Sequence, residues 1–126
     1  MANLTDYLEN ALLNHVLRNT PYTSPTTVYV ALFTTATTDA GGGTEVAGGS
    51  YARQAVTFGA PSGGSSSNTG QLVYNNMPGV TVTHAAIMDA PTGGNMLFHN
   101  ALQTPRVVPA ADTFTFNIAQ VTATLE

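Results

Sequence analysis

Two of the three histidines could offer a metal ion a pair of imidazole ligands. If residues 84–89 and 94–99 form a hairpin, His84 lies directly opposite His99 on one face of the sheet. A zinc site needs three or four ligands, however, and no third ligand is in sight near this pair. The pairing also depends on the register, and a slip of one residue would turn one imidazole to the other face. We therefore expect a hydrogen-bonded pair of core or interface histidines and no metal site.

The carboxylates Asp39 and Glu45 flank a glycine-rich stretch and could bind Ca²⁺ together with backbone carbonyls. The simpler interpretation is that they are two solvated loop acids. The serines lie in loop-like stretches without a nucleophile-elbow sequence, and the glycine runs lack the lysine of a phosphate-binding loop. The chain has no cysteine, which excludes disulfides and thiol catalysis. We expect no catalytic residues and no cofactor, so the chain is not expected to be an enzyme.

The charge of the chain is unusually low for its length of 126 residues. Only 8% of residues are charged, where about 25% is usual, and the net charge is −4. The three arginines lie far apart in the sequence, which argues against a nucleic-acid partner, because neutralising phosphates takes clustered cations. No apolar run approaches the ~20 residues of a membrane span. A surface with so little charge is typical of a chain that packs against neighbours.

The N-terminal segment predicts an α-helix at about residues 4–18. Leu8, Leu12 and Val16 recur at helical spacing, and Thr5 or Asp6 can cap the start. Prolines shortly after residue 18 prevent the helix from continuing. Two interpretations stay open for its apolar face. It packs on the sheet of its own chain, or it is an arm that docks onto a partner subunit.

The rest of the chain predicts strands. Residues Thr26–Thr35 are apolar on both faces, which favours a strand buried on both sides. Further strands are expected at Tyr51–Phe58, Gln71–Met77, Gly79–Asp89, Asn95–Leu102 and Asp112–Leu125. Two prolines make residues 104–109 an irregular or edge segment. The glycine-rich stretches 39–50 and 59–70 are expected to be long loops, at least one of them held by a partner subunit.

These elements predict one mainly β domain, a sandwich or barrel with an N-terminal α-helix and a β domain at about residues 26–126. Both halves of the chain are too short for separate cores, so the glycine-rich stretches are loops and not domain linkers.

Three stretches resemble the small virion proteins of tailed bacteriophages, many of which carry a tail-fibre label. They are Leu13–Thr35, Gly41–Arg53 and Ala85–Leu102, and the likeness spans nearly the whole chain in the same order. The combination of a helix, a VYVALFT strand and a glycine loop ending in YAR is fairly specific. The resemblance implies a non-enzymatic structural subunit located in the virion.

Two positions in the particle fit such a subunit. A compact 13.0 kDa chain without repeats favours a capsid cement (decoration) protein that stabilises the shell, whereas fibre shafts are usually long and repetitive. The alternative is a tail-fibre or tail-tip component. A third interpretation is a module that binds a host-surface glycan on Tyr22, Tyr51 or Tyr74. The expected partners are the major capsid protein and copies of the chain itself, as a dimer or trimer. The expected contact residues are Leu8, Leu12, Val16, Val107 and Val108.

Overall fold

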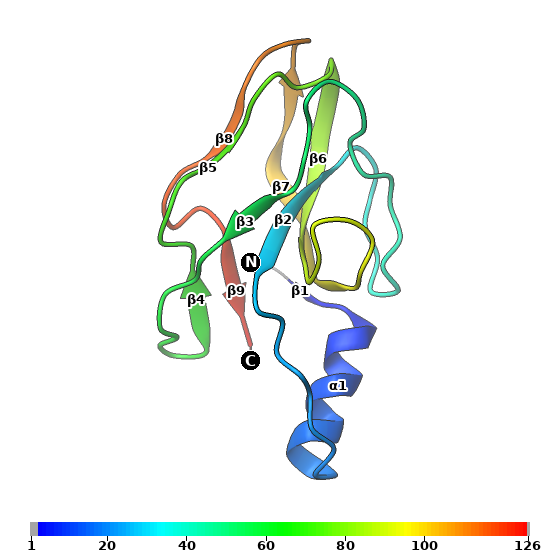
Figure 1. Cartoon of the computed structure of the whole chain (residues 1–126), viewed down its shortest axis with the longest axis vertical. Coiled ribbons are helices and arrows are strands. Elements are labelled where there is room, and N and C mark those ends of the chain that lie inside the picture. Colours follow the sequence, from blue (N-terminus) through cyan, green and yellow to red (C-terminus); the bar gives the residue numbers. More distant parts are fainter. Residues whose placement is uncertain (1–2, 126) are drawn as a thin grey trace.

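The computed structural model describes residues 3–125 and is mainly β with one N-terminal helix, which confirms the predicted fold class. Figure 1 shows a sheet with short two-stranded ribbons beside it and the helix at one end. The elements in chain order are β1 (Asn3–Leu4), α1 (Asp6–Leu17), β2 (Val28–Phe33), β3 (Gln54–Val56), β4 (Ser65–Ser67), β5 (Leu72–Tyr74), β6 (Val80–Met88), β7 (Met96–Val108), β8 (Phe114–Phe116) and β9 (Thr122–Thr124).

Five strands form one antiparallel sheet in the order β1-β7-β6-β2-β3. Two ribbons, β4-β9 and β5-β8, are separate from it. The main core brings apolar side chains of the sheet together with those of β5 and β8. The sheet is open, because β1 and β3 are its edges, so the architecture is layered and is not a closed barrel.

Strand β2 is buried on both faces, as its sequence predicts. Val30 and Leu32 point into the main core, while Ala31 and Phe33 belong to a second cluster on the opposite face. The second cluster is completed by small and flexible side chains of the neighbouring strands, Ala86, Met88 and Met96. A strand of this kind needs cover on two sides.

The structure confirms the edge character predicted for residues 104–109, and it shows in addition that β7 runs without a break through Pro105 to Val108. The edge strand β1 pairs only with Phe98 and His99, so the remainder of β7 has a partner on one side only. Pro105 lies in the stretch of β7 where the pairing with β6 changes register, between the pairs made by Ala101 and Arg106. Proline is tolerated at such edge irregularities because no ladder bond is lost there.

Helix α1 begins and ends close to the predicted positions. Thr5 is its N-cap: the hydroxyl accepts a hydrogen bond from the Leu8 N–H and donates one to the Met96 carbonyl, which fastens the helix to β7. Leu8 is buried and Leu12 packs partly against the core, but Val16 is 72% exposed. The second half of α1 therefore projects from the body of the molecule (Figure 1). No helix within residues 3–125 is long and apolar enough to cross a membrane.

The two glycine-rich stretches make ordered contacts inside the chain itself. The prediction that 59–70 is a single loop is wrong, because Ser65–Ser67 forms β4 and pairs with β9. Gly63 and Gly64 both have positive φ and form the tight turn that a two-residue hairpin requires. Serine hydroxyls then meet threonine hydroxyls across the ribbon, as in the Ser65 and Thr124 pair at 3.2 Å. A run of serines carries no apolar alternation, so nothing in its sequence signals a strand.

The buried hydroxyl of Tyr74 links β5 to the central strand and provides a test of this architecture. It donates a hydrogen bond of 2.7 Å to the Val30 carbonyl, and the residue is 1% exposed. We predict that Tyr74→Phe lowers the free energy of unfolding by about 1–2 kcal/mol, because the carbonyl is left buried without this donor. Urea unfolding followed by circular dichroism measures the change. Tyr29→Phe, at a half-buried site on β2, is the control and should change it less.

Candidate functional site

His99 occupies the centre of a relay of three side chains that runs from a buried hydroxyl to an exposed carboxylate. Its Nδ1 lies 2.8 Å from the Thr37 hydroxyl, and its Nε2 lies 2.8 Å from the Asp39 carboxylate. The predicted pair of facing histidines is wrong in register, since His99 faces Ala86. Two offsets cause this: Met88 pairs with Met96, one residue later than expected, and a register shift between Ile87 and Met88 adds a second residue. His84 lies opposite Ala101 and contacts the hydroxyl of its neighbour, Thr83, at 2.9 Å.

The order hydroxyl, imidazole, carboxylate is that of a nucleophile, its base and an orienting acid. Exposure argues against this chemistry, because Thr37 is only 8% exposed while the side chain of Asp39 is 60% exposed. A nucleophile has to be reached by its substrate, and here the outermost group is the acid. The relay instead fastens the glycine-rich loop to β7. It also places the Asp39 carbonyl where it accepts the N–H of Asp6, the first residue of α1, at 2.9 Å.

Glu45 lies in a second network, which fixes the other end of the same loop. The Arg53 guanidinium donates two hydrogen bonds to the Glu45 carboxylate, at 2.8 and 2.9 Å, and two more to the carbonyls of Ala90 and Gly93. The Tyr51 hydroxyl donates to the same carboxylate at 2.7 Å. This explains the YAR sequence after the glycine loop, since both of its polar side chains hold that loop in place. The alternative of two solvated loop acids is therefore wrong for Glu45.

The calcium interpretation of Asp39 and Glu45 is also not supported by the geometry. Asp39 binds His99, and Glu45 binds Arg53 and Tyr51, so each carboxylate serves a separate network. Within residues 3–125 no three side chains of the metal-binding types come together.

The second network shifts the pKa values of its members. Burial alone would raise the pKa of Glu45, but hydrogen bonds from Arg53 and Tyr51 and the positive charge of Arg53 outweigh it and lower the pKa. Burial raises the pKa of the Tyr51 hydroxyl, and the adjacent Glu45 carboxylate raises it further. The phenol therefore stays protonated and donates to Glu45 while accepting the Leu32 N–H at 2.9 Å.

The tyrosines expected as sugar platforms are not available for that role. Tyr51 stacks on Tyr74 with ring centroids 6.1 Å apart, and Tyr74 is almost completely buried. Tyr22 packs partly against the core, and its backbone N–H donates to the Nδ1 of His15 on α1. A glycan site based on these three rings is therefore ruled out for Tyr74 and poorly supported for the other two.

Five residues were expected to contact a partner, and the structure separates them into two groups. Leu8 and Val108 are each only 5% exposed and pack in the core of the chain itself, which takes them out of reach of a partner. Val16 and Val107 are more than 70% exposed, and Leu12 is half-buried. Sequence reasoning missed the exposure of Leu13 and Leu17. Together with Val16 they form an apolar cluster on the projecting half of α1, called here the helix tip.

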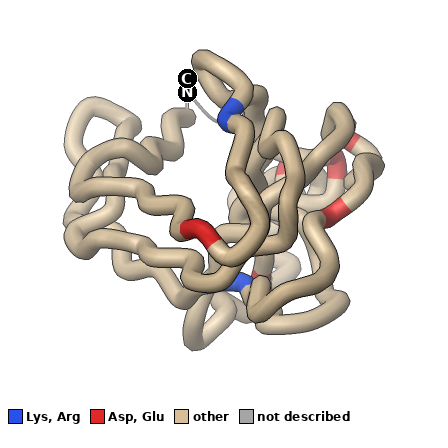
Figure 2. Tube along the Cα trace, turned by 90° about the horizontal axis from the view of Figure 1, so that it is seen from above, with Lys and Arg blue, Asp and Glu red and all other residues tan. Residues whose placement is uncertain are grey.

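The surface around these side chains carries few charges. The chain contains no lysine, and its few arginines and carboxylates are coloured positions on a trace that is otherwise uncharged (Figure 2). Arg53 is taken up by the internal ion pair, so it adds little to the surface charge. Contacts with another protein must then rest mainly on apolar and hydrogen-bonded groups.

Residues 3–124 match the model of a protein family described as podophage GP4 fiber I protein gp80. The chain belongs to this family. The resemblance to small phage virion proteins is thereby confirmed, and so is the expected location in the virion. No curated protein matches the chain.

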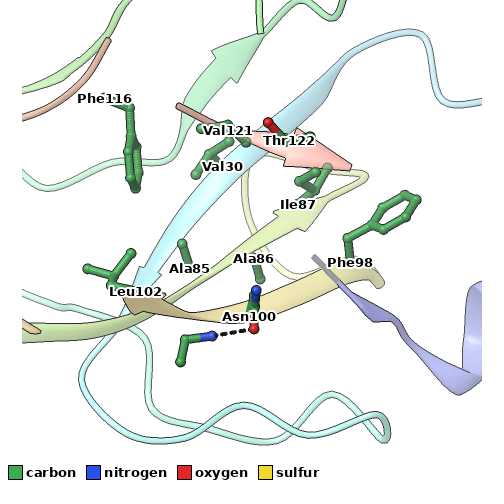
Figure 3. Close-up of a pocket in the computed structure, with 11 residues that line it drawn as sticks. Val30, Ala85, Ala86, Ile87, Phe98, Asn100, Leu102, Phe116, Val121 and Thr122 are labelled. Atoms are coloured by element: carbon green, nitrogen blue, oxygen red, sulfur yellow. Dashed lines mark hydrogen bonds between the residues drawn. The ribbon is translucent and has the colours of Figure 1, made fainter. Parts of the chain in front are cut away.

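In this fibre-family chain, apolar grooves lie between the sheet and the C-terminal segment. One groove of about 100 Å³ runs under residues 116–122, where Val30 and Ile87 of the sheet approach Val121 and Thr122 (Figure 3). A larger groove of about 300 Å³ continues under the β4-β9 ribbon and shares Ile87 and Phe98 with the first. No charged side chain lines either groove, so both suit apolar groups and not ionic ligands.

The ion pair of this family member predicts a specific dependence of stability on pH. Because folding lowers the pKa of Glu45, its contribution is fully present above the unfolded value of about 4.3 and is lost as the pH falls through the folded value. We predict that Glu45→Gln lowers the free energy of unfolding at neutral pH by about 1–3 kcal/mol. The difference from the wild type should narrow on acidification to about pH 3.

Urea unfolding at several pH values measures this difference. Glu9→Gln, at an exposed carboxylate on α1, is the matched control and should leave stability within about 0.5 kcal/mol of the wild type. A constant difference between Glu45→Gln and the wild type at every pH would contradict the assignment of the ion pair.

Proposed function

We propose that this chain is a non-enzymatic structural subunit of a phage tail fibre that works by packing against copies of itself and neighbouring virion subunits. The observation that carries the proposal is the helix tip, where Leu13, Val16 and Leu17 are each more than half exposed on a projecting helix. Covering such side chains stabilises an assembly by about 25 cal/mol per Å² of apolar surface removed from water. The low charge of the chain leaves little repulsion between copies.

We propose the fibre position over the capsid-cement position, although the small size of the chain by itself favours a cement protein. The family description as a fibre protein supports the fibre. The architecture suits either position, because a cement and a fibre subunit both need exposed apolar contacts and no catalysis. The major capsid protein is therefore a partner only if the cement position is correct.

Labelling of intact particles tests the position. Gold-conjugated antibody against the chain should mark the tail region in electron micrographs, and particles that lack the chain should fail to adsorb to host cells. Their capsids should lose DNA at the same temperature as wild-type capsids. Label over the whole capsid, with capsids that open at lower temperature and normal adsorption, would establish the cement position and overturn this proposal.

Self-association through the helix tip makes a separate prediction. Light scattering of the purified chain should give the mass of a dimer or trimer, and Val16→Lys should reduce it toward the 13.0 kDa monomer. Val16 is 72% exposed, so lysine replaces it without disturbing the fold, and a cation near the end of a helix is favourable.

Val107→Lys is the matched control for this experiment, because Val107 is also exposed but lies on the edge of β7. It should leave the oligomer intact. If Val107→Lys dissociates the oligomer and Val16→Lys does not, the edge of β7 is the contact. A wild-type chain that is already monomeric at micromolar concentration contradicts self-association.

A further inference from the structure

A polar groove of about 230 Å³ lies on the edge of β7, away from the helix tip and from the two loop networks. It is called here the Arg106 groove, and it is lined by Leu102, Gln103, Thr104, Arg106, Phe114, Phe116 and Gln120. The bulged stretch of β7 forms one wall, and β8 with the turn after it forms the other. Its lining contains one cation and no carboxylate.

The guanidinium of Arg106 differs from those of the other two arginines. Arg53 donates hydrogen bonds to Glu45 and to two backbone carbonyls, and Arg18 donates one to the Asn14 side chain at 3.0 Å. The side chain of Arg106 makes no hydrogen bond to any group within residues 3–125, whereas its backbone belongs to the ladder between β7 and β6. Its guanidinium lies 5.1 Å from the centre of the Phe114 ring, and Phe114 is 1% exposed. The cation is therefore held over a rigid ring while its N–H donors point to no protein acceptor.

The neighbours of Arg106 add neutral hydrogen-bonding groups and an apolar wall. Gln120 accepts the backbone N–H of Asn117 through its side-chain oxygen at 2.7 Å, which leaves its amide hydrogens as donors in the groove. Gln103 and Thr104 are exposed on the bulged stretch of β7. Phe116 and Leu102 are half-buried and supply apolar surface. The groove thus combines one fixed positive charge, amide and hydroxyl groups, and an apolar side.

We propose that the Arg106 groove binds a carboxylate-bearing saccharide. The guanidinium takes the carboxylate through paired N–H donors, which is the strongest form of this contact. The glutamine amides and the threonine hydroxyl bind sugar hydroxyls, and Phe116 with Leu102 contacts the C–H face of the ring. A single cation cannot hold a polyanionic nucleic acid, which requires several phosphates to be neutralised.

The chemical class of the ligand follows from the residues of the groove, while the placing of that ligand on a host surface rests on the proposed fibre function. The saccharide proposal and the fibre proposal can be disproved independently of each other. Particle labelling decides where the chain lies in the virion, whereas saccharide binding is measured on the isolated full-length chain. If the chain binds the saccharide but lies on the capsid, the proposal for the groove stands and the proposed fibre function is wrong.

The test is a titration of the ¹⁵N-labelled chain with a glucuronate-containing hyaluronan oligosaccharide, followed by NMR. Resonances of Arg106, Gln103 and Gln120 should shift and saturate, and those of the helix tip should not. Arg106→Gln should weaken binding about tenfold or more, since it removes a charge-assisted hydrogen-bonding pair. Arg18→Gln makes the same change of charge at the exposed C-cap of α1 and should bind as the wild type does.

Two further ligands separate the carboxylate from its alternatives. A neutral chitin oligosaccharide should bind at least about tenfold more weakly than the hyaluronan oligosaccharide. Glucose 6-phosphate tests whether any anionic sugar suffices, and binding of it without binding of the uronate would overturn the carboxylate assignment. The proposal is also overturned if Arg106→Gln binds hyaluronan as well as the wild type, or if no resonance shifts at millimolar saccharide.

Discussion

Strand β2 is apolar on both faces, and the rest of the structure depends on covering both of them. The β5 and β8 strands cover Val30 and Leu32 and form the main core. On the opposite face, the glycine-rich loop packs on Phe33, so closely that a Cβ at Gly43 would lie 3.2 Å from its ring. Loops of this composition have no packing of their own to hold them, and ordering them costs backbone entropy. The relay through His99 and the ion pair through Arg53 supply the missing restraint at the two ends of the loop.

The chain has few charged side chains, and those with structural partners lie in separate parts of the structure. Glu45 and Arg53 are used inside the molecule, where removal of one partner leaves the other without its counter-charge. The guanidinium of Arg106 is held over an aromatic ring and makes no hydrogen bond to a group within residues 3–125. The remaining surface carries few charges, with an apolar cluster on a helix that projects beyond its own sheet. This distribution fits a subunit of a virion assembly, which spends its working life against neighbours.

Much of the fold could be predicted from local patterns, and the failures have a common physical cause. The helix between Thr5 and Arg18 was predictable because capping, periodicity and prolines act within a few residues. The strand at Val28–Phe33 was predictable because a strand with apolar side chains on both faces is stable only where both faces are covered. The serine strand β4 was not, since its pairing depends on hydroxyls of Thr122 and Thr124 more than fifty residues away. The edge position of residues 104–108 was predictable from Pro105 and Pro109, but the continuation of β7 to Val108 was not, because no local pattern shows that β6 pairs there.

The sequence by itself determined the fold class, the start and end of α1, the low charge of the surface and the membership of a phage virion family. These properties depend on composition and on contacts between near neighbours. Only the tertiary structure decided which polar side chains meet. His99 contacts Thr37 and Asp39 and does not face His84, because the turn and a register shift between Ile87 and Met88 displace β7 relative to β6. No local sequence pattern encodes this displacement. In the same way, Arg53 donates hydrogen bonds to carbonyls some forty residues away, whereas the side chain of Arg106 has no hydrogen-bond partner within residues 3–125. The partners of each arginine are decided by which distant segments the packed core brings together.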